Sequence, residues 1–387
     1  MRVALVHDFL TQRGGAERVV LHLARTLADP VIVTALYAPE QTYPEFRALE
    51  VMAHRWVDGN DARHFRRHVL AYPKQFASFD LSDFDLAIIS SSAFAHHVRH
   101  PLSAVYWHTP PRFLYDPGAY LHSTFAGRVA SLPLWSLRRG DRRAATAHQL
   151  HSANSLRTAA RLRRCYGIEA TVIHPPFDGS HLGALTNPPA SPRALVVSRL
   201  LPYKRVDVAI AACESLGLPL TVVGDGPERV RLQSMASSST TFRGVLSDAA
   251  LAEAYATHSL VICPGSEDFG FVPLEAGYAG RPVIASMRGG ASETVVSGRT
   301  GLLVDGWDVD DWAAAIAWVL EHQWHPGDLR TCTSQFDAAH FDAAARKWLE
   351  PLEIAAAERG GHIRARLVQA GAWEGGPRAP HASPLAH

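Results

Sequence analysis

The chain has 387 residues, of which 47% are hydrophobic and 19% are charged, and its formal net charge at pH 7 is +1. This length suits two domains better than one, and so large a hydrophobic fraction excludes a wholly disordered chain. The four cysteines, Cys165, Cys213, Cys263 and Cys332, form no CxxC pair, so we expect no disulfide framework and a reducing, cytoplasmic environment.

Charge is shared unevenly between the two halves of the chain. Residues 1–180 hold 21 Lys and Arg against 15 Asp and Glu (+6), and residues 181–387 hold 17 against 22 (−5). A basic first half could face an anionic surface or acceptor, although unequal solvation of two ordinary domains explains it equally well. We expect no nucleic-acid partner. No apolar stretch reaches the roughly 18–20 residues of a membrane span, and Met1-Arg2 opens directly into a strand-like run.

The first half alternates strand-like runs with helical stretches. The strand-like runs lie at 2–9, 30–36, 85–90, 103–108, 148–153 and 170–174. Between the first two, Val19, Val20, Leu23 and Leu27 have the spacing of one helix face. Apolar strands separated by helices predict a parallel sheet that is covered on both faces.

The second half repeats this organisation after a proline-containing linker at 176–193. Strands are predicted at 194–198, 220–224, 240–244, 260–265, 282–286 and 301–304, with helices at 248–258 and 308–322. The sequence therefore predicts an α/β fold of two doubly wound domains, 1–175 and 194–335. Residues 336–371 are expected to form helices that pack back toward the N-terminal domain, before a disordered tail at 372–387. Ligands of such sheets bind beyond the carboxyl ends of the strands, here in a cleft between the domains.

Two stretches in the first half place polar or flexible residues after a strand. In HDFLTQRGGAERV (7–19), Gly14 and Gly15 allow close backbone approach before a helix whose N-terminus favours an anion. The stretch is neither a dinucleotide fingerprint nor a phosphate loop, and a tight packing turn explains it equally well. In VYWHTPPRFLYD (105–116), a strand delivers His108, where an imidazole can donate, accept or orient, although a lone histidine is more often structural.

Two stretches in the second half carry charge after a strand. SRLLPYKRVD (198–207) offers Arg199 and Lys204, two cations that suit a diphosphate, or else form a solvated basic loop. EDFGFVPLEA (267–276) predicts a helix that begins near Pro273, with Glu275 in its first turn and Glu267 on the preceding loop. A capping acid beside a surface acid is the alternative. Further along, Glu293 is expected to cap or orient the helix that follows it.

Taken together, these stretches resemble the retaining, nucleotide-sugar-dependent glycosyltransferases of the GT-B fold over roughly residues 1–350. The most specific feature is the Glu-x7-Glu pair of Glu267 and Glu275, while RGGAERV and HTPPRFLYD resemble a mannosyltransferase-like subgroup of bacterial enzymes. The resemblance implies two Rossmann-like domains that face a cleft. It also implies transfer of a hexose, above all mannose from GDP-mannose, to a glycan or lipid-linked acceptor in cell-surface polysaccharide or glycolipid synthesis.

The resemblance also implies roles in donor binding. Arg199 and Lys204 would bind the donor diphosphate and support its departure, Glu275 would hold the ribose hydroxyls, and Glu267 would contact the donor sugar near the reacting centre. The loop between the two acids would present backbone amides to the sugar or phosphate, and it comprises Asp268, Phe269, Gly270, Phe271 and Val272.

The N-terminal domain would complete the site from the other side of the cleft. Gly14 and Gly15 would close on the diphosphate, and His108, Arg112 and Tyr115 would lie on the acceptor side, with His108 also taking part in catalysis. Related enzymes usually need neither a metal nor another cofactor, and no Asp-x-Asp pair follows a strand here.

Other functions remain open at this point. A UDP-sugar or another GDP-sugar could be the donor. A nucleotide-sugar 2-epimerase shares the architecture, and release of a free altered sugar would reveal it. A non-catalytic sugar-binding protein is a third possibility, against which Arg199, Lys204, Glu267 and Glu275 argue together.

Peripheral contact with the inner face of the cell membrane is a separate hypothesis. It rests on two basic clusters, one of Arg63, Arg66, Arg67 and Lys74 and one of Arg138, Arg139, Arg142 and Arg143. Both could meet anionic lipid, and both could equally be solvated helix faces.

Overall fold

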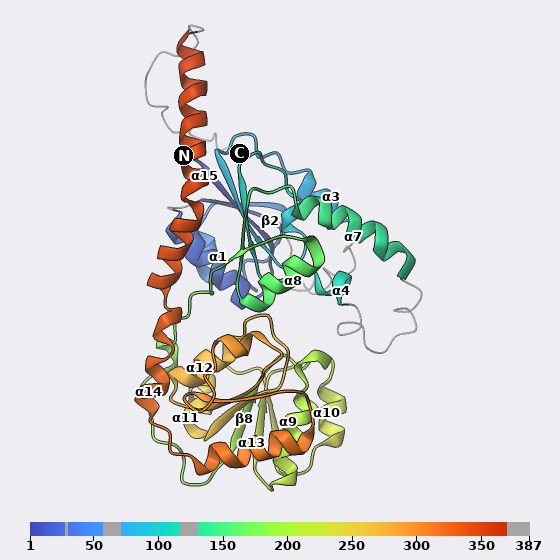
Figure 1. Ribbon diagram of the computed structural model, residues 1–387, viewed down its shortest axis with the longest axis vertical. Helices are drawn as coiled ribbons and strands as arrows, with labels where there is room; N and C mark the ends of the chain where they lie inside the picture. The colour runs from blue at the N-terminus through green and yellow to red at the C-terminus, as the bar shows by residue number, and fades with distance from the viewer. Residues whose placement is uncertain (28–29, 57–70, 117–130, 370–387) are drawn as a thin grey trace, which may run out of the picture.

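The computed structural model describes residues 1–27, 30–56, 71–116 and 131–369, which form two α/β domains. In Figure 1 the N-terminal domain, coloured blue to green, lies above the C-terminal domain, coloured yellow to orange. The chain passes between the domains twice, and the two passages touch where the backbone N–H of Phe177 donates to the carbonyl of Phe336 (2.7 Å).

The N-terminal domain is built on a seven-stranded sheet of order β3-β2-β1-β4-β5-β6-β7. Its strands are β1 (Val3–Leu10), β2 (Val31–Tyr37), β3 (Val51–Trp56), β4 (Leu86–Ser91), β5 (Ser103–Trp107), β6 (Leu150–Ala153) and β7 (Thr171–Val172). Its helices are α1 (Gly15–Thr26), α3 (Tyr72–Ala77), α4 (Arg112–Tyr115), α7 (Ser131–Ala145) and α8 (Leu156–Tyr166), with short 3₁₀ helices η1 (Pro44–Ala48) and η3 (Ala95–His97).

The C-terminal domain is built on a six-stranded sheet of order β10-β9-β8-β11-β12-β13. Its strands are β8 (Ala194–Val197), β9 (Leu220–Val223), β10 (Thr240–Gly244), β11 (Leu260–Cys263), β12 (Val283–Ser286) and β13 (Gly301–Val304). Its helices are α9 (Val206–Ser215), α10 (Arg229–Met235), α11 (Asp248–Thr257), α12 (Val272–Tyr278), α13 (Val309–Glu321) and α14 (Pro326–Thr331). The 3₁₀ helices are η4 (Ser180–Leu182), η5 (Pro202–Lys204), η6 (Gly290–Glu293) and η7 (Ser334–Phe336), and α15 (Ala338–Gln369) ends the described chain.

Both sheets reverse their strand order beside their first strand. The reversal lies between β1 and β4 in the N-terminal sheet and between β8 and β11 in the C-terminal sheet, and these strands pair in parallel. In doubly wound sheets, ligands bind outside the carboxyl ends of the strands at such a switch point. Three of the loops that carry predicted site residues leave the sheets at these two points, after β1, β8 and β11, whereas the loop that begins with His108 follows β5, the neighbour of β4.

Burial follows from the parallel arrangement. All seven residues of β2 are buried, because helices cover both faces of a parallel sheet. The α8 helix shows how local sequence sets an element's ends. The Ser155 side chain accepts from the backbone N–H of Thr158 at its start, and Gly167 closes it in the left-handed region (φ 73°).

The long C-terminal helix α15 returns to the N-terminal domain and lies along its side (Figure 1). Five of its apolar side chains join the core cluster that covers β1 and α1, namely Phe341, Ala345, Trp348, Leu349 and Leu352. The Thr26 hydroxyl at the end of α1 also donates to the Asp342 carboxylate (2.7 Å). The last segment of the chain therefore completes the core of the first domain.

The predicted strands are confirmed to within two residues at each end, and the sequence analysis missed one strand. That strand is β3, an edge strand of mixed polar and apolar residues. Residues 372–387 and the basic residues Arg63, Arg66 and Arg67 lie outside the described residues. Among the helices that the structure describes, none combines the length and apolar character that crossing a bilayer requires.

Truncation of α15 side chains tests how far it stabilises the first domain. Leu349 is buried against the N-terminal core, so we expect Leu349→Ala to lower the free energy of unfolding by about 2–5 kcal/mol in urea denaturation. Ile354 on the same helix is exposed, and Ile354→Ala serves as the control, with an expected change within about 0.5 kcal/mol. Equal effects of the two substitutions would contradict a structural role for α15.

Candidate functional site

Gly15 of the N-terminal domain lies against the loop between Glu267 and Glu275 of the C-terminal domain. Gly14 precedes α1 and Gly15 begins it. A Cβ atom added to Gly15 would lie 2.5 Å from the ring of Phe271, which immediately precedes α12. Only glycine allows this approach, so the packing between the domains explains Gly15.

Lys204 and Glu267 form an ion pair between the two charged loops of the C-terminal domain. Lys204 Nζ lies 2.5 Å from Glu267 Oε1, and the lysine side chain is largely buried. The loops are tightly apposed, because a Cβ on Gly265 would lie 2.9 Å from Lys204 Cα. Arg199, at the start of the same loop, is exposed and has no ion-pair partner among the described residues.

Glu275 lies in the first turn of α12, as predicted from the sequence. The Tyr255 hydroxyl donates to Glu275 Oε2 (2.7 Å), which fixes the orientation of the carboxylate. Burial raises the pKa of the Cys263 thiol, and the charges of Glu267 and Glu275 raise it further while Lys204 opposes them. The structure therefore gathers Lys204 and both acids around the end of β11.

The loop between the two acids does not expose all of its side chains. Phe269 is buried and packs on Phe336, whereas Gly270 adopts a left-handed conformation (φ 86°) that favours glycine. The Asp268 carboxylate pairs with Arg112 and Arg161 of the N-terminal domain. Arg112, which we predicted on the acceptor side, thus contacts the loop between Glu267 and Glu275.

His108 lies at the carboxyl end of β5, beside the cleft. Its Nε2 is 2.8 Å from Ser90 Oγ, and His7 Nδ1 is 3.1 Å from both the carbonyl and the hydroxyl of Ser90. Because a carbonyl only accepts, we assign a proton to His7 Nδ1, and the assignment that uses the Ser90 hydroxyl proton has this hydroxyl donating to His108 Nε2. Burial, reinforced by His7, lowers the pKa of His108 to about 3. His108 is therefore a neutral ring with its proton on Nδ1.

Glu17 is a buried acid that the sequence analysis did not single out. It lies in the first turn of α1, and its Oε2 has no hydrogen-bond partner among the described residues. Burial raises the pKa of Glu17, while His7 and Arg199 oppose that shift. Arg199 of the C-terminal domain is thus among the charges that favour the ionised form of Glu17.

Tyr115, also predicted on the acceptor side, donates to Asp141 Oδ2 (2.9 Å). Tyr166 donates to the same oxygen (2.7 Å), and His96 and His97 lie 2.9 and 3.3 Å from Oδ1. Two histidines and a carboxylate could hold a metal ion, but these hydrogen bonds already engage both carboxylate oxygens. The cluster joins α4, α7 and η3 as a buried hydrogen-bond network.

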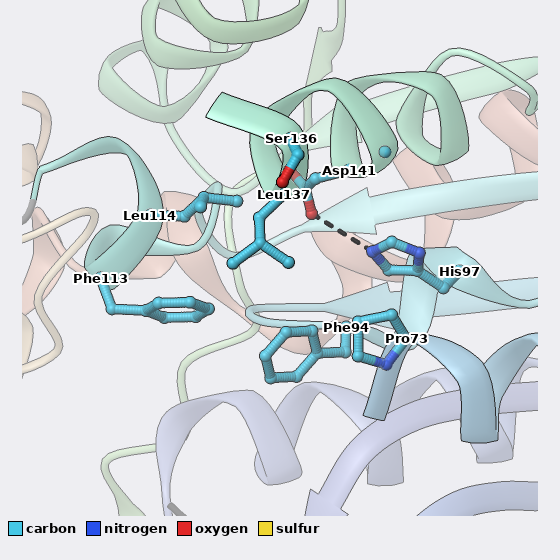
Figure 2. A pocket seen from close by; sticks show the side chains of 9 residues that line it. Pro73, Phe94, His97, Phe113, Leu114, Ser136, Leu137 and Asp141 are labelled. Atoms are coloured by element: carbon cyan, nitrogen blue, oxygen red, sulfur yellow. Dashed lines mark hydrogen bonds and ion pairs between the residues drawn. The ribbon is translucent and has the colours of Figure 1, made fainter. Parts of the chain in front are cut away.

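An apolar pocket of about 120 Å³ lies beside this network. Figure 2 shows Phe113 and Leu114 of α4 and Leu137 of α7 around it, with Phe94 below and the His97–Asp141 contact at one side. The α4 helix therefore joins two regions, because Arg112 at its start contacts Asp268 and the next two residues line the pocket.

Several residues of the interface were missed because their partners are distant in sequence. Glu293 accepts from the backbone N–H groups of Leu156 (2.8 Å) and Arg157 (3.2 Å), so it caps α8 of the other domain rather than the helix that follows it. The expectation for Glu293 was therefore wrong. The local S/T-x-x-E signal of a capping box reports only caps within one segment, and this cap spans 136 residues or more.

Comparison with known proteins identifies the family. Residues 183–335 match the family described as Glycosyl transferases group 1. A GDP-mannose-dependent alpha-mannosyltransferase of Mycolicibacterium smegmatis is 32% identical over 345 residues, which span 83% of this chain and 88% of that protein. The chain belongs to the group 1 glycosyltransferases.

Two further similarities refine this assignment. A GDP-mannose-dependent alpha-(1-6)-phosphatidylinositol monomannoside mannosyltransferase of Mycobacterium tuberculosis is 39% identical to this glycosyltransferase over 147 residues, 33% of this chain and 38% of that protein. The crystal structure of Anabaena HepE with UDP has a TM-score of 0.66 at 20% identity, and the match covers 91% of this chain and all of HepE. The predicted GT-B fold is confirmed.

The buried histidines predict how the stability of this glycosyltransferase depends on pH. Burial lowers the pKa of His148 and of His151 to about 4, and that of His108 to about 3. Unfolding returns them to about 6.5, so the unfolded chain binds more protons between pH 6.5 and 4. We expect the free energy of unfolding, measured in urea, to be constant near pH 7–8 and to fall as the pH drops through this window.

His148→Gln provides the comparison for that profile. The glutamine amide can replace the contact of His148 Nε2 with the carbonyl of His96 (2.8 Å) but cannot titrate. The variant should therefore lose less stability than the parent protein between pH 6.5 and 4.5. Parallel profiles for the two proteins would show that protonation of His148 does not contribute.

Proposed function

We propose that this glycosyltransferase transfers mannose from GDP-mannose to a glycan or lipid-linked acceptor in cell-surface polysaccharide or glycolipid synthesis, with retention of anomeric configuration. The observation that carries the proposal is the similarity, over 83% of the chain, to a protein named as a GDP-mannose-dependent alpha-mannosyltransferase. The gathering of Lys204, Glu267 and Glu275 at the switch point of the C-terminal sheet supports it.

The charge distribution suits departure of a nucleoside diphosphate. Negative charge builds on the diphosphate as the bond between sugar C1 and the phosphate oxygen breaks, and fixed cations stabilise that charge without reorganising. Arg199 is exposed and free of ion pairs among the described residues, so its guanidinium can bind a phosphate bidentately. Lys204 is held at its place by Glu267, with its ammonium beside the donor loop.

The remaining residues have roles that follow from their positions. Glu275, oriented by Tyr255, would accept from the ribose hydroxyls, and the neutral His108 would donate from Nδ1 to a sugar or acceptor oxygen. Glu267 would contact the donor sugar, and its pairing with Lys204 leaves it a poor nucleophile. We therefore propose attack of the acceptor hydroxyl on the face from which the phosphate leaves, with its proton passing to the departing phosphate oxygen. Neither a metal nor another cofactor takes part in this scheme.

A calorimetric titration tests the donor assignment. We expect GDP and GDP-mannose to bind more tightly than UDP, ADP and their sugars, with EDTA present throughout.

Arg199→Ala should lower the rate of mannose transfer by about 10²–10³-fold, because one fixed charge at the departing group is lost. Arg193, exposed at the opposite end of β8, gives the matched control, and Arg193→Ala should leave the rate unchanged.

Each of the other functions predicts a different outcome in these binding and activity measurements. Preferred binding of UDP would move the donor to a UDP-sugar, as the UDP complex of HepE illustrates for a protein of this fold. Release of a free altered sugar without acceptor would indicate an epimerase. Activity lost in EDTA and restored by Mg²⁺ would contradict the metal-free scheme, and product of inverted configuration, seen by NMR, would contradict retention.

We also propose that the N-terminal domain meets anionic lipid through α7. Trp135 on this helix is 68% exposed, and Arg139, Arg142 and Arg143 are exposed on the turns that follow. An exposed tryptophan with a basic face is typical of helices that lie in a membrane interface. The neighbouring apolar pocket between α4 and α7 supports a lipid-linked acceptor.

Liposome flotation tests the membrane contact. We expect the protein to float with vesicles of phosphatidylcholine and phosphatidylglycerol but not with phosphatidylcholine alone, and less so at high salt. The triple variant Arg139→Gln, Arg142→Gln, Arg143→Gln should lose the interaction, because each basic residue contributes about 1 kcal/mol of binding free energy at an anionic surface. Equal recovery with neutral and anionic vesicles would remove the electrostatic part of this proposal.

A further inference from the structure

The donor loop, residues 266–272, is held by side chains of the opposite domain. Asp268 Oδ1 lies 2.8 Å from Arg161 Nη1 of α8. Asp268 Oδ2 lies 2.9 Å from Nη2 and 3.1 Å from Nε of Arg112 in α4. The three side chains are only 15%, 7% and 11% exposed for Asp268, Arg161 and Arg112, so solvent screens these ion pairs weakly.

The backbone of the donor loop is held by the same elements. The Ser155 hydroxyl donates to the carbonyl of Asp268 (2.5 Å), and Arg112 Nη2 donates to the carbonyl of Ser266 (3.2 Å). Arg157 Nη2 donates to the Ser266 hydroxyl (2.6 Å). The residues on both sides of Glu267 are therefore fixed by the N-terminal domain, although Glu267 itself pairs with Lys204 of its own domain.

Arg112 also contacts the second charged loop. Its guanidinium carbon lies 4.6 Å from the ring centroid of Tyr203, the neighbour of Lys204 in η5. A guanidinium over an aromatic face at this distance is an attractive cation–π contact. One side chain of the N-terminal domain thus touches the loop that carries Glu267 and the loop that carries Lys204.

The charge balance of this interface depends on Asp268. Three guanidiniums, those of Arg112, Arg157 and Arg161, converge on the loop. Among the described residues, Asp268 is the only acid that forms ion pairs with any of them, and its partners are Arg112 and Arg161. Arg161 Nε and Nη2 and Arg157 Nε are buried without a hydrogen-bond partner among the described residues. Loss of the Asp268 charge would leave buried cations close together, which costs far more than loss of an exposed pair.

A second carboxylate of the C-terminal domain fixes α8, the helix that carries Arg157 and Arg161. Glu293 accepts from two backbone N–H groups at the start of α8 and lies 2.9 Å from His174 Nε2. These contacts cross between the domains, so the C-terminal domain holds the start of α8, while Leu162 and Tyr166 anchor the helix in the N-terminal core. Asp268 and Glu293 hold the start of α8 from both sides of the donor loop.

We propose that Asp268 is a positioning residue whose ion pairs with Arg112 and Arg161 latch the closed domains, so that Glu267 reaches its working position only when the N-terminal domain is in place. This proposal rests on the proposed function, since it assigns Glu267 to the donor sugar. It moves Asp268 away from direct donor contact and Arg112 away from direct acceptor contact. The C-terminal domain then binds the nucleotide through Arg199, Lys204 and Glu275 without the latch, whereas sugar transfer requires the closed domains.

Substitution of Asp268 in the full chain tests the latch. Asp268→Asn keeps the shape of the side chain but removes its charge. We expect kcat for transfer from GDP-mannose to fall by up to about 100-fold, because small displacements of a positioned group have effects of that size. The Kd for GDP should stay within about twofold, and the radius of gyration measured by small-angle X-ray scattering should increase.

Variants on α8 provide the matched control. Arg161→Gln should act like Asp268→Asn, and the double variant should lose less than the sum of the two single effects on ln kcat. Arg163 lies on the exposed side of α8 and pairs with Glu169, so Arg163→Gln should change neither kcat nor the radius of gyration. Thermal unfolding identifies any variant that fails to fold, and Asp268→Glu, which keeps the charge, should recover part of the activity.

The outcomes separate the latch from the proposed function. Loss of GDP binding in Asp268→Asn with no change in the radius of gyration would overturn the latch in favour of direct donor contact. A parent-like kcat and radius of gyration would also overturn it. If the parent protein fails to use GDP-mannose while Asp268→Asn still increases the radius of gyration, the mannosyltransferase assignment fails and the domain contact stands.

Discussion

The carboxylate of Asp268 is the interaction on which the arrangement of this site depends. It lies on a loop of the C-terminal domain, and its ion-pair partners Arg112 and Arg161 belong to the N-terminal domain. Each domain alone therefore presents only one sign of this charge cluster. Closure brings cations and carboxylate together at low exposure, where the attraction is strong and the cost of an unpaired charge is high.

The site is also shaped by how each domain fixes its own charged groups. Lys204 is paired with Glu267, and Glu275 is oriented by Tyr255, so contacts within the C-terminal domain orient these three charged groups. In the N-terminal domain, Ser90 links His7 to His108, and burial keeps the imidazole of His108 neutral. Fixed groups of this kind stabilise developing charge because they need not reorganise during the reaction.

The sequence predicted much of the fold and the position of Glu275 in its helix, and it failed where partners are distant along the chain. Parallel strands that are buried on both faces leave a clear pattern, whereas the short, half-polar edge strand β3 does not. Glu275 was placed in the first turn of its helix from a local signal, Pro273. Arg161 and Glu293 gave no such signal, because their contacts join segments more than 100 residues apart.

The sequence by itself determined the two doubly wound domains, the linker between them and the loops that carry Arg199, Lys204, Glu267 and Glu275, because local periodicity and turn residues set these features. Tertiary structure alone decided that Asp268 and Arg112 face each other, that α15 completes the first domain, and that Tyr115 bonds Asp141. The sequence gives the type and charge of each side chain. Its hydrogen-bond or ion-pair partner depends on which distant segment the packed core brings within bonding distance.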